Sequence, residues 1–316
     1  MKKINDLENA IYSTVESFSS EKALFSLETN VYWPKWNSPW WHMALLKEMG
    51  LSDRIPRGII RKLLDEFLKK CIDFFPFRES DVPKGKDPIA DIPCHCQLGC
   101  MCQVLFSCGF DVDVEIPWAR PWFLKYQLPD GGLNCDEAVY LKSSPKSSIV
   151  STLPALEAIL SCTNRPFTEA EITFLDAGAQ YLLRHRLFRS ASHPGNIINP
   201  DWKRICFPRF YEYDFLRGLA FICRWAEKLS RKPNREALDE SLALIMELTA
   251  PEKNAPITGR RSWEGAKTFR YMPDGSRTWG HAAEPFPLLE MVGVPGSPCS
   301  FLEDDLKAVR QIFPKY

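Results

Sequence analysis

Cysteine and histidine side chains are concentrated in one short segment, Cys94-His95-Cys96, which is followed by Cys100 and Cys102. Thiolate sulfur and imidazole nitrogen are common zinc ligands, and thiolates separated by roughly two to four residues are typical of zinc sites. The spacing of Cys96 and Cys100 places both on one helical turn. The segment is apolar, however, so a stripe of thiols packed against neighbouring helices, without metal, is the alternative.

The eleven cysteines are spread along the chain, mostly in apolar helical contexts such as Cys71, Cys108, Cys162 and Cys223. An odd number distributed in this way indicates reduced thiols rather than a disulfide framework. The basic residues near the start are not followed by the apolar segment of a signal peptide, and no apolar run reaches the length of a membrane span. We therefore expect a cytoplasmic protein without a transmembrane segment.

Charged residues are balanced, because forty Lys and Arg residues face forty Asp and Glu residues. Without a long basic block, the chain lacks the electrostatic pattern of nucleic-acid binding or of an anionic membrane surface. A chain of 316 residues with 45% hydrophobic residues can bury a large core. No low-complexity linker divides it, although residues 78–91 and 191–208 are expected to be loops. We expect one domain over residues 1–316, in which an N-terminal helix within residues 1–30 can be peripheral.

Helix signals recur along the chain. Ser38, Pro39 and Gly50 supply an N-cap, a proline at the first helical position and a C-terminal glycine around an apolar segment. Thr168 and Glu171 form a capping box. Apolar helices are expected to begin near residues 38, 95, 147, 211 and 281, and strand-like alternation is nearly absent. Amphipathic helices are expected between them, at residues 56–75, 168–186, 234–248 and 301–313, with a mixed helix at 117–126. Apolar helices need enclosure and amphipathic helices need a surface to cover, so inner and outer layers satisfy both.

Two segments share the order aromatic residue, Pro-Asp-Gly, and a small or aromatic residue: Tyr126-Gln-Leu-Pro-Asp-Gly-Gly-Leu-Asn-Cys135 and Tyr271-Met-Pro-Asp-Gly-Ser-Arg-Thr-Trp-Gly280. This recurrence resembles the repeat of squalene–hopene cyclases and of protein prenyltransferase β subunits, in the terpenoid cyclase superfamily. The resemblance implies an all-α fold, an α/α toroid with paired inner and outer helices around a central cavity. Residues 129–132 and 273–275 are expected to be equivalent turns, in which Gly131 and Gly132 adopt conformations that a Cβ atom disfavours.

In the families that this chain resembles, the inner helices are parallel and their N-terminal ends surround the mouth of the cavity. Applied here, this arrangement brings together polar residues from distant segments, although capping of the helices is an alternative explanation for each. The candidate acid and base residues are His95, Asp136, Tyr213, Asp214 and His281. The candidate ligand-binding residues are Trp41, His42, Asn134, Tyr211 and Glu284.

Four tryptophans, Trp33, Trp36, Trp40 and Trp41, lie in one segment. Aromatic rings that face a cavity can stabilise a cationic ligand or intermediate. Packing in the core is the alternative for each ring.

The metal ligands of the related families are only partly present. Protein prenyltransferase β subunits bind zinc through an Asp and a Cys in the helix after a Gly-Gly-Phe turn, but the corresponding helix here begins Pro145-Lys-Ser-Ser, without either ligand. Lanthionine cyclases, also α/α toroids, use an adjacent Cys-His pair with a further Cys. If zinc is bound, the expected ligands are Cys94, His95, Cys135 and His281, in preference to the stripe from Cys96 to Cys102.

Three functions remain open. The first is an enzyme that acts on an apolar or isoprenoid-like small molecule in the central cavity, with Asp136, Asp214 or His95 as acid or base, in the manner of a terpene cyclase or prenyltransferase. Asp111-Val-Asp-Val-Glu115 is superficially similar to the acid motif of squalene–hopene cyclases, but its place at an outer-helix start favours capping. The second is a non-catalytic toroid that binds a lipid-like ligand or a partner. The third is a zinc-dependent transferase or lyase that uses a Cys/His site. The sequence leaves the substrate and the oligomeric state undetermined.

Overall fold

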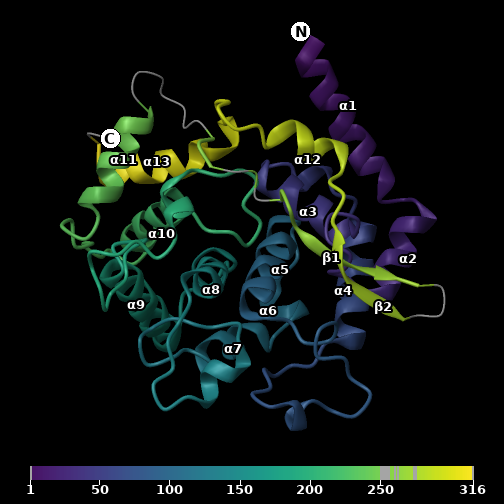
Figure 1. The fold of residues 1–316 in the computed structure, drawn as a ribbon, viewed down its shortest axis with the longest axis horizontal. Helices are drawn as coiled ribbons and strands as arrows, with labels where there is room; N and C mark the ends of the chain where they lie inside the picture. The colour runs from purple at the N-terminus through teal and green to yellow at the C-terminus, as the bar shows by residue number, and fades with distance from the viewer. Residues whose placement is uncertain (1, 250–256, 260, 262, 273–275, 315–316) are drawn as a thin grey trace.

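The computed structural model describes residues 2–249, 257–259, 261, 263–272 and 276–314. This part of the chain is mostly helical, with one small antiparallel sheet (Figure 1). Figure 1 shows helices α5 (His95–Ser107) and α8 (Ile149–Ser161) near the middle of the molecule, with other helices around them.

Four apolar helices form a consecutive series at the core. They are α3 (Pro39–Glu48), α5, α8 and α10 (Phe215–Lys228). Helix α3 packs against α5, α5 packs closely against α8, and α8 contacts α10. Ser38 caps α3 and accepts a hydrogen bond from the backbone N–H of Trp40, as its sequence predicts. Four of the five expected apolar helices are therefore confirmed.

Amphipathic helices cover this series. They are α4 (Arg57–Lys70), α7 (Ala119–Lys125), α9 (Glu169–Arg184), α11 (Asp239–Thr249) and α13 (Glu303–Ile312). Helix α9 packs against α8, and α13 packs along α10. The predicted capping box of Thr168 and Glu171 is present at the start of α9.

Shorter elements complete the described structure. Helices α1 (Lys2–Ser17) and α2 (Glu21–Thr29) occupy the N-terminal segment, and α1 projects from one edge in Figure 1 while contacting α12 (Pro287–Val292). Asp111 caps α6 (Val112–Glu115), the role that its position favours. The 3₁₀ segments are η1 (Ser52–Arg54), η2 (Glu79–Asp81), η3 (Glu137–Leu141), η4 (Pro200–Lys203) and η5 (Ser300–Leu302).

The residues on either side of the second Pro-Asp-Gly differ from their prediction. They form two antiparallel strands, β1 (Lys267–Tyr271) and β2 (Arg277–Ala282), in which Thr268 pairs with His281 and Phe269 with Trp279. The apolar helix expected near residue 281 begins later than predicted, as α12, because the chain stays extended through Ala282. The rings of Phe269 and Trp279 both contact Trp33, a distant packing partner that favours the extended conformation. The expected turn at residues 273–275 lies outside the described residues.

The first Pro-Asp-Gly segment is the turn that the sequence predicts. Gly131 has φ of 94°, and a Cβ atom there would lie 2.4 Å from the carbonyl oxygen of Ala177. A Cβ atom on Gly132 would lie 2.6 Å from Cβ of Ser147. The absence of side chains at both positions lets the turn pack against α9 and the start of α8.

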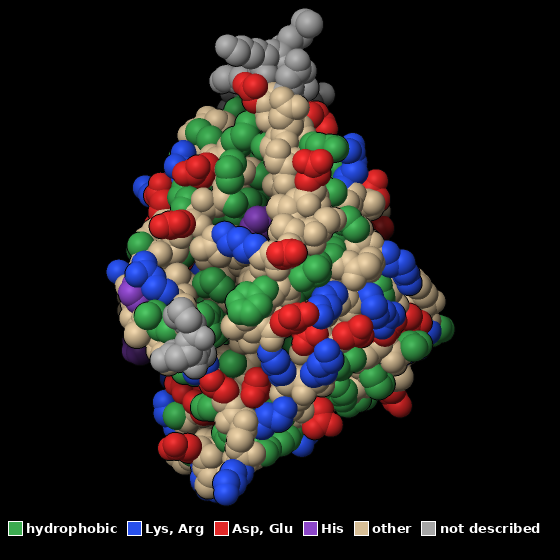
Figure 2. Space-filling model, turned by 90° about the vertical axis from the view of Figure 1, so that its right-hand side faces the viewer, with side chains coloured by type: hydrophobic (Ala, Val, Ile, Leu, Met, Phe, Trp, Pro, Cys, Tyr) green, Lys and Arg blue, Asp and Glu red, His purple; other side chains and the backbone are tan. Residues whose placement is uncertain are grey.

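The surface shows mixed charge. Figure 2 shows acidic and basic side chains interspersed over the side of the molecule that lies on the right in Figure 1. Within the described residues, no helix combines the length and the apolar character that crossing a membrane requires.

Candidate functional site

Three cysteine thiols converge at the N-terminal end of α5. Cys94 precedes the helix, Cys96 lies in its first turn, and Cys135 lies in the loop that follows Gly131 and Gly132. Their sulfur atoms all lie within 4.8 Å of one another, with 3.3 Å between Cys94 and Cys96 and 3.7 Å between Cys96 and Cys135. Zn–S bonds of about 2.3 Å in tetrahedral geometry place two sulfur atoms about 3.8 Å apart. The arrangement therefore suits a thiolate-bound metal ion.

Hydrogen bonding within this thiol cluster favours one thiolate. Hydrogen bonding with Cys94 and Cys96 lowers the pKa of Cys135 well below its usual value, against the effect of burial. The hydrogen bond with Cys135, together with burial, raises the pKa of Cys94 and that of Cys96. The backbone N–H of Cys135 donates to Oγ of Ser151 on α8, at 3.1 Å, which fixes the loop. The loop therefore holds Cys135 in a constrained position beside the other two thiols.

His95 lies between Cys94 and Cys96 in the sequence, and its ring makes two hydrogen bonds. Its Nδ1 accepts a hydrogen bond from the indole N–H of Trp122 at 2.8 Å, and its Nε2 lies 3.0 Å from the hydroxyl of Tyr140. Because an indole N–H can only donate, the proton of His95 must be on Nε2. Burial lowers the pKa of His95 to about 4, so the ring is neutral near pH 7. Both ring nitrogens of His95 are therefore engaged, in contacts with Trp122 and Tyr140.

Tyr140 connects this histidine to the loop of Cys135. Its hydroxyl accepts a hydrogen bond from the backbone N–H of Asn134 at 3.2 Å and donates to the carbonyl of Tyr126 at 3.1 Å. The start of α5 and the cysteine-bearing loop are therefore joined through one buried polar network. Such outer hydrogen bonds commonly orient metal ligands.

The rings of Trp33, Trp36, Trp41 and Tyr211 form an aromatic wall beside the thiol cluster, and the ammonium group of Lys35 lies among them. Nζ of Lys35 donates to the hydroxyl of Tyr211 at 2.6 Å and lies 5.8–5.9 Å from the ring centroids of Trp33, Trp36 and Trp41. Burial lowers the pKa of Lys35, while the charges of Glu212, Cys96 and Cys94 oppose this effect. The tryptophans pack on one another, with 4.7 Å between the centroids of Trp36 and Trp41. They therefore belong to the core and also surround the Lys35 ammonium group.

A cavity lies near the other end of α5. It has a volume of about 690 Å³ and is lined by α3, α5, α8, α10 and the start of α13. A smaller pocket lined by Trp41, Cys100, Gln103 and Tyr211 lies between this cavity and the aromatic wall. Cys96, Cys100 and Gln103 have the spacing of one helix face, so a single face of α5 runs from the thiol cluster to the cavity.

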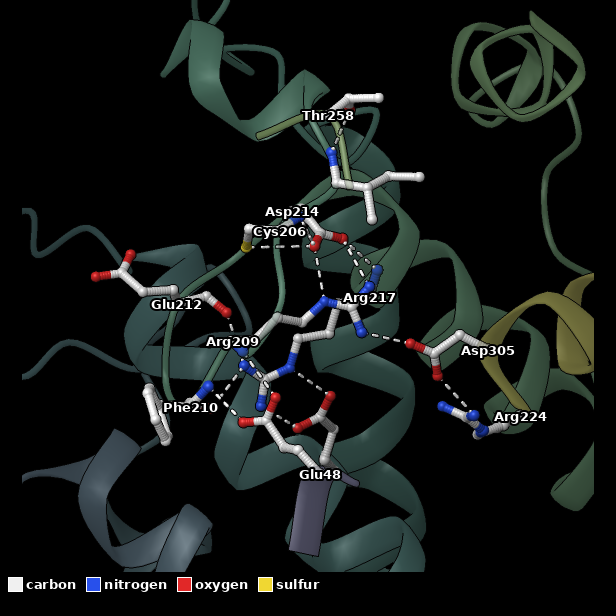
Figure 3. A network of polar contacts seen from close by, with 12 residues as sticks. Glu48, Cys206, Arg209, Phe210, Glu212, Asp214, Arg217, Arg224, Thr258 and Asp305 are labelled. Carbon is white, nitrogen blue, oxygen red and sulfur yellow. Dashed lines mark hydrogen bonds and ion pairs between the residues drawn. The ribbon is translucent and has the colours of Figure 1, made fainter. Parts of the chain in front are cut away.

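Ion pairs build one wall of the cavity (Figure 3). Asp214 caps α10 and accepts hydrogen bonds from Arg209 on both carboxylate oxygens, at 2.7 and 3.0 Å. Asp305 bridges Arg209 and Arg224, and Figure 3 shows it between the two guanidinium groups. Arg217 makes a bidentate pair with Glu157, with N–O distances of 2.9 and 2.7 Å.

The expected acid and base residues make separate contacts. Asp214 is fully buried in its pair with Arg209, and the hydroxyl of Tyr213 donates to the carbonyl of Leu187 at 2.7 Å. Asp136 is exposed and caps η3. His281 lies on β2, where its Nε2 is 2.7 Å from the hydroxyl of Thr278. Across the described residues, no hydrogen bond or ion pair joins two of these side chains or His95.

The expected ligand-binding residues are likewise divided. Trp41 and Tyr211 lie in the aromatic wall, whereas Glu284 is exposed beyond β2. Nε2 of His42 donates to the carbonyl of Trp36 at 3.0 Å, and its ring stacks on Phe286. Asn134 accepts from the backbone N–H of Asp136 at 2.9 Å and stabilises the cysteine loop.

The sequence favoured His95 over Cys96 as a ligand, and its expected central cavity opened at the N-terminal ends of the inner helices, whereas the observed cavity lies near the C-terminal end of α5. Of the four expected metal ligands, the structure brings Cys94 and Cys135 together and adds Cys96, while His95 and His281 have the other partners described above. A signal for the cavity was available, because Glu157 and Arg217 are charged residues within largely apolar helices. Buried charges of this kind require partners.

Comparisons with known proteins add little to this description. No protein-family model matches the chain, and no curated protein matches it. Among solved structures, the chain is similar to a variant of the type II terpene cyclase MstE from Scytonema in complex with its substrate, geranylgeranyl dihydroxybenzoate. The match covers 98% of each chain at 13% identity, with a TM-score of 0.30. A likeness at this TM-score carries no argument for fold or function.

Proposed function

We propose that this protein is a zinc-dependent enzyme, of the transferase or lyase type, in which Cys94, Cys96 and Cys135 bind one zinc ion. The observation that carries the proposal is the convergence of three sulfur atoms within 4.8 Å. Two thiols come from the start of one rigid helix, and the third comes from a loop held by Ser151 and Tyr140. The expected α/α toroid is part of this proposal, supported by the series of apolar helices under an amphipathic layer.

The number of ligands favours catalysis over a purely structural site. Structural zinc sites usually have four protein ligands, whereas catalytic sites have three and leave one position for water or substrate. The cluster offers three Cys side chains among the described residues. Zinc held by these three residues would supply Lewis-acid activation of a ligand, such as a thiol, at the remaining position.

The surroundings of the cluster fit this chemistry. Zinc with three thiolates carries a formal charge of −1, from +2 and three charges of −1. The ammonium of Lys35, whose pKa responds to the charges of Cys94 and Cys96, would balance that charge. The neighbouring rings of Trp41 and Tyr211 offer an apolar surface. A small molecule with an apolar part is therefore the expected substrate class.

The proposal differs from an acid–base mechanism that uses the expected carboxylates. Asp214 accepts two hydrogen bonds from Arg209, and Asp136 is an exposed cap. Neither is placed as a free proton donor in an enclosed apolar pocket. The zinc hypothesis requires no such donor.

Elemental analysis of the purified protein tests the proposal. We expect about one zinc per chain after expression with added zinc, and loss of that zinc in Cys96→Ser and Cys135→Ser. Cys108→Ser is the matched control, because Cys108 is a half-buried thiol at the opposite end of α5. Far-ultraviolet circular dichroism checks that each variant is folded.

His95→Gln distinguishes the two ligand sets. The structure predicts that His95→Gln keeps the zinc stoichiometry, since both ring nitrogens point to Trp122 and Tyr140. Loss of zinc in His95→Gln with retention in Cys96→Ser would favour the ligands expected from sequence. Protein that contains no zinc under these conditions, or whose intact mass shows a disulfide in place of the thiols, would overturn the proposal.

A further inference from the structure

The cavity wall has carboxylates whose oxygens are already used. Both oxygens of Glu48 accept backbone N–H groups, from Arg209 at 2.7 Å and from Phe210. Both oxygens of Glu157 accept from Arg217, and both of Asp305 pair with arginines. Figure 3 shows Glu48 and Asp305 facing these donors. These three carboxylates therefore already have partners within the protein.

Two cations of the same wall retain unused donors. Lys47 has three N–H groups, of which the described contacts engage one, with the amide oxygen of Gln103 at 2.8 Å. Arg224 has five N–H groups, and its described ion pair engages one nitrogen, with Asp305 at 2.7 Å. Both residues line the cavity, Lys47 from α3 and Arg224 from α10. Each of these two side chains can therefore donate further hydrogen bonds to a ligand that supplies acceptors.

Part of the remaining lining is apolar, beside polar and charged residues such as Ser107, Glu303 and Lys307. Phe106, Leu160, Phe207 and Phe221 contribute rings and a branched chain from three helices and a loop. The volume of about 690 Å³ lies within the range of about 300–1,000 Å³ that small-molecule sites occupy. A ligand that fills this space must therefore combine an anionic end with an apolar body.

We propose that this cavity binds a small amphiphilic oxyanion, a carboxylate or phosphate on an apolar body, with the anionic group held by Lys47 and Arg224. Charge-assisted hydrogen bonds from ammonium and guanidinium groups are the strong contacts that such oxygens accept. The apolar body lies along Phe106 and Phe221. This site shares no residue with the thiol cluster, so the proposal goes beyond the zinc chemistry and stands without it.

Isothermal titration with three probes of equal chain length tests the proposal: decanoate, decyl phosphate and decanol. We expect at least one of the two anions to bind at least ~10-fold more tightly than decanol, which corresponds to one charge-assisted contact. The preference between the two anions identifies the headgroup. Lys47→Met and Arg224→Met should each weaken binding of the preferred anion at least ~10-fold and leave decanol binding unchanged.

Control variants separate the outcomes. Lys142→Met, at an exposed lysine away from the cavity, should bind as the wild type. If Lys47→Met does not fold, Lys47→Gln keeps a polar side chain and should show the same loss of anion binding. Cys96→Ser should retain anion binding even where it loses zinc, so failure of one proposal is distinguishable from failure of the other. Equal affinity for decanoate, decyl phosphate and decanol, or unchanged anion affinity in both cation variants, would overturn the inference.

Discussion

The two ends of α5 carry different kinds of polar group. At the N-terminal end, three thiols face one another, and the groups behind them, His95 and Tyr140, are neutral hydrogen-bonding partners. At the other end, guanidinium and carboxylate groups pair at a cavity, where the described contacts of Lys47 and Arg224 leave donors unused. The first end has thiols without a cation among the ligand atoms, and the second has two cations with unused donors. The comparison indicates what each end would bind: a soft metal ion at one and an oxyanion at the other.

The distance along the helix keeps the two sites separate. The helical rise places Ser107 about 16 Å beyond Cys96 along the axis. Cys100 and Gln103 lie between them on the same face, beside the small aromatic pocket. A ligand in the cavity therefore need not touch the thiol cluster, and each site can be altered without the other.

The largest expected effect is that of Asp214→Asn at the cavity end. Asp214 is fully buried, and replacing its charge leaves Arg209 without its bidentate partner. Breaking a buried ion pair from one side costs about 3–5 kcal/mol of unfolding free energy. Denaturant unfolding measures this loss, with zinc content unchanged.

Asp136→Asn is the control for that variant, because Asp136 is an exposed cap whose replacement should cost about 1 kcal/mol or less. Equal losses in the two variants would contradict the assignment of Asp214 to a structural ion pair.

The buried ion pair of Arg120 and Glu171, away from the cavity, should also stabilise the fold, and its contribution should depend on pH. Burial disfavours the charge of Glu171, but hydrogen bonds from Arg165 and Thr168 and the charge of Arg120 lower its pKa to about 2. Because the folded pKa lies below the unfolded value, the stabilisation is present above about pH 4.3 and is lost as the pH falls toward about 2. The difference between the folded and unfolded pKa of Glu171 corresponds to about 3 kcal/mol of unfolding free energy.

Glu171→Gln should flatten the stability profile across that acid range, as measured by denaturant unfolding at several pH values. Glu169→Gln is the matched control, because Glu169 lies in the same helical turn and is exposed. An unchanged acid profile in Glu171→Gln would show that other carboxylates dominate acid unfolding.

Tyr140→Phe should have a smaller effect on stability at the thiol end. It removes the hydroxyl that joins His95, the N–H of Asn134 and the carbonyl of Tyr126. Loss of these bonds should cost about 1–3 kcal/mol. If the cluster binds zinc, its affinity should fall about 10–100-fold, because outer hydrogen bonds orient the ligands. Competition with a chelator measures this affinity, with Tyr12→Phe at an exposed tyrosine as the control.

Local rules were enough to predict much of the fold. Ser38 and Thr168 cap their helices as expected, and Gly131 adopts the positive φ that the turn requires. The two strands were missed because they are stabilised by distant rings, among them Trp33 against Phe269. Short segments with aromatic and β-branched residues take the conformation that their tertiary partners select.

The ligand set of the thiol cluster likewise depends on tertiary contacts that local sequence does not specify. Cys94 and Cys135 were expected as ligands, but the choice between His95 and Cys96 depends on which neighbour faces the loop. Consecutive residues of a helix point about 100° apart, and the contact of His95 with Trp122 decides that Cys96 faces Cys135. The pair of Glu157 and Arg217 joins α8 to α10, a contact that no local pattern specifies.

The smallest expected effect concerns the exposed pair of Arg61 and Glu115, whose geometry matches the buried pairs. The two hydrogen bonds are 2.8 and 2.6 Å long, yet the side chain of Arg61 is 44% exposed. Water and salt screen such a pair, so Arg61→Met should cost only about 0–1 kcal/mol, and less at high salt. Arg120→Met is the buried counterpart, with a side chain 7% exposed in its pair with Glu171, and should cost about 3–5 kcal/mol at any salt concentration. Denaturant unfolding of both variants at low and high salt measures the difference. Equal losses of unfolding free energy in the two variants would mean that the geometry of an ion pair, rather than its desolvation, determines its contribution to stability. The electrostatic contrast drawn between the two ends of α5 would then be contradicted.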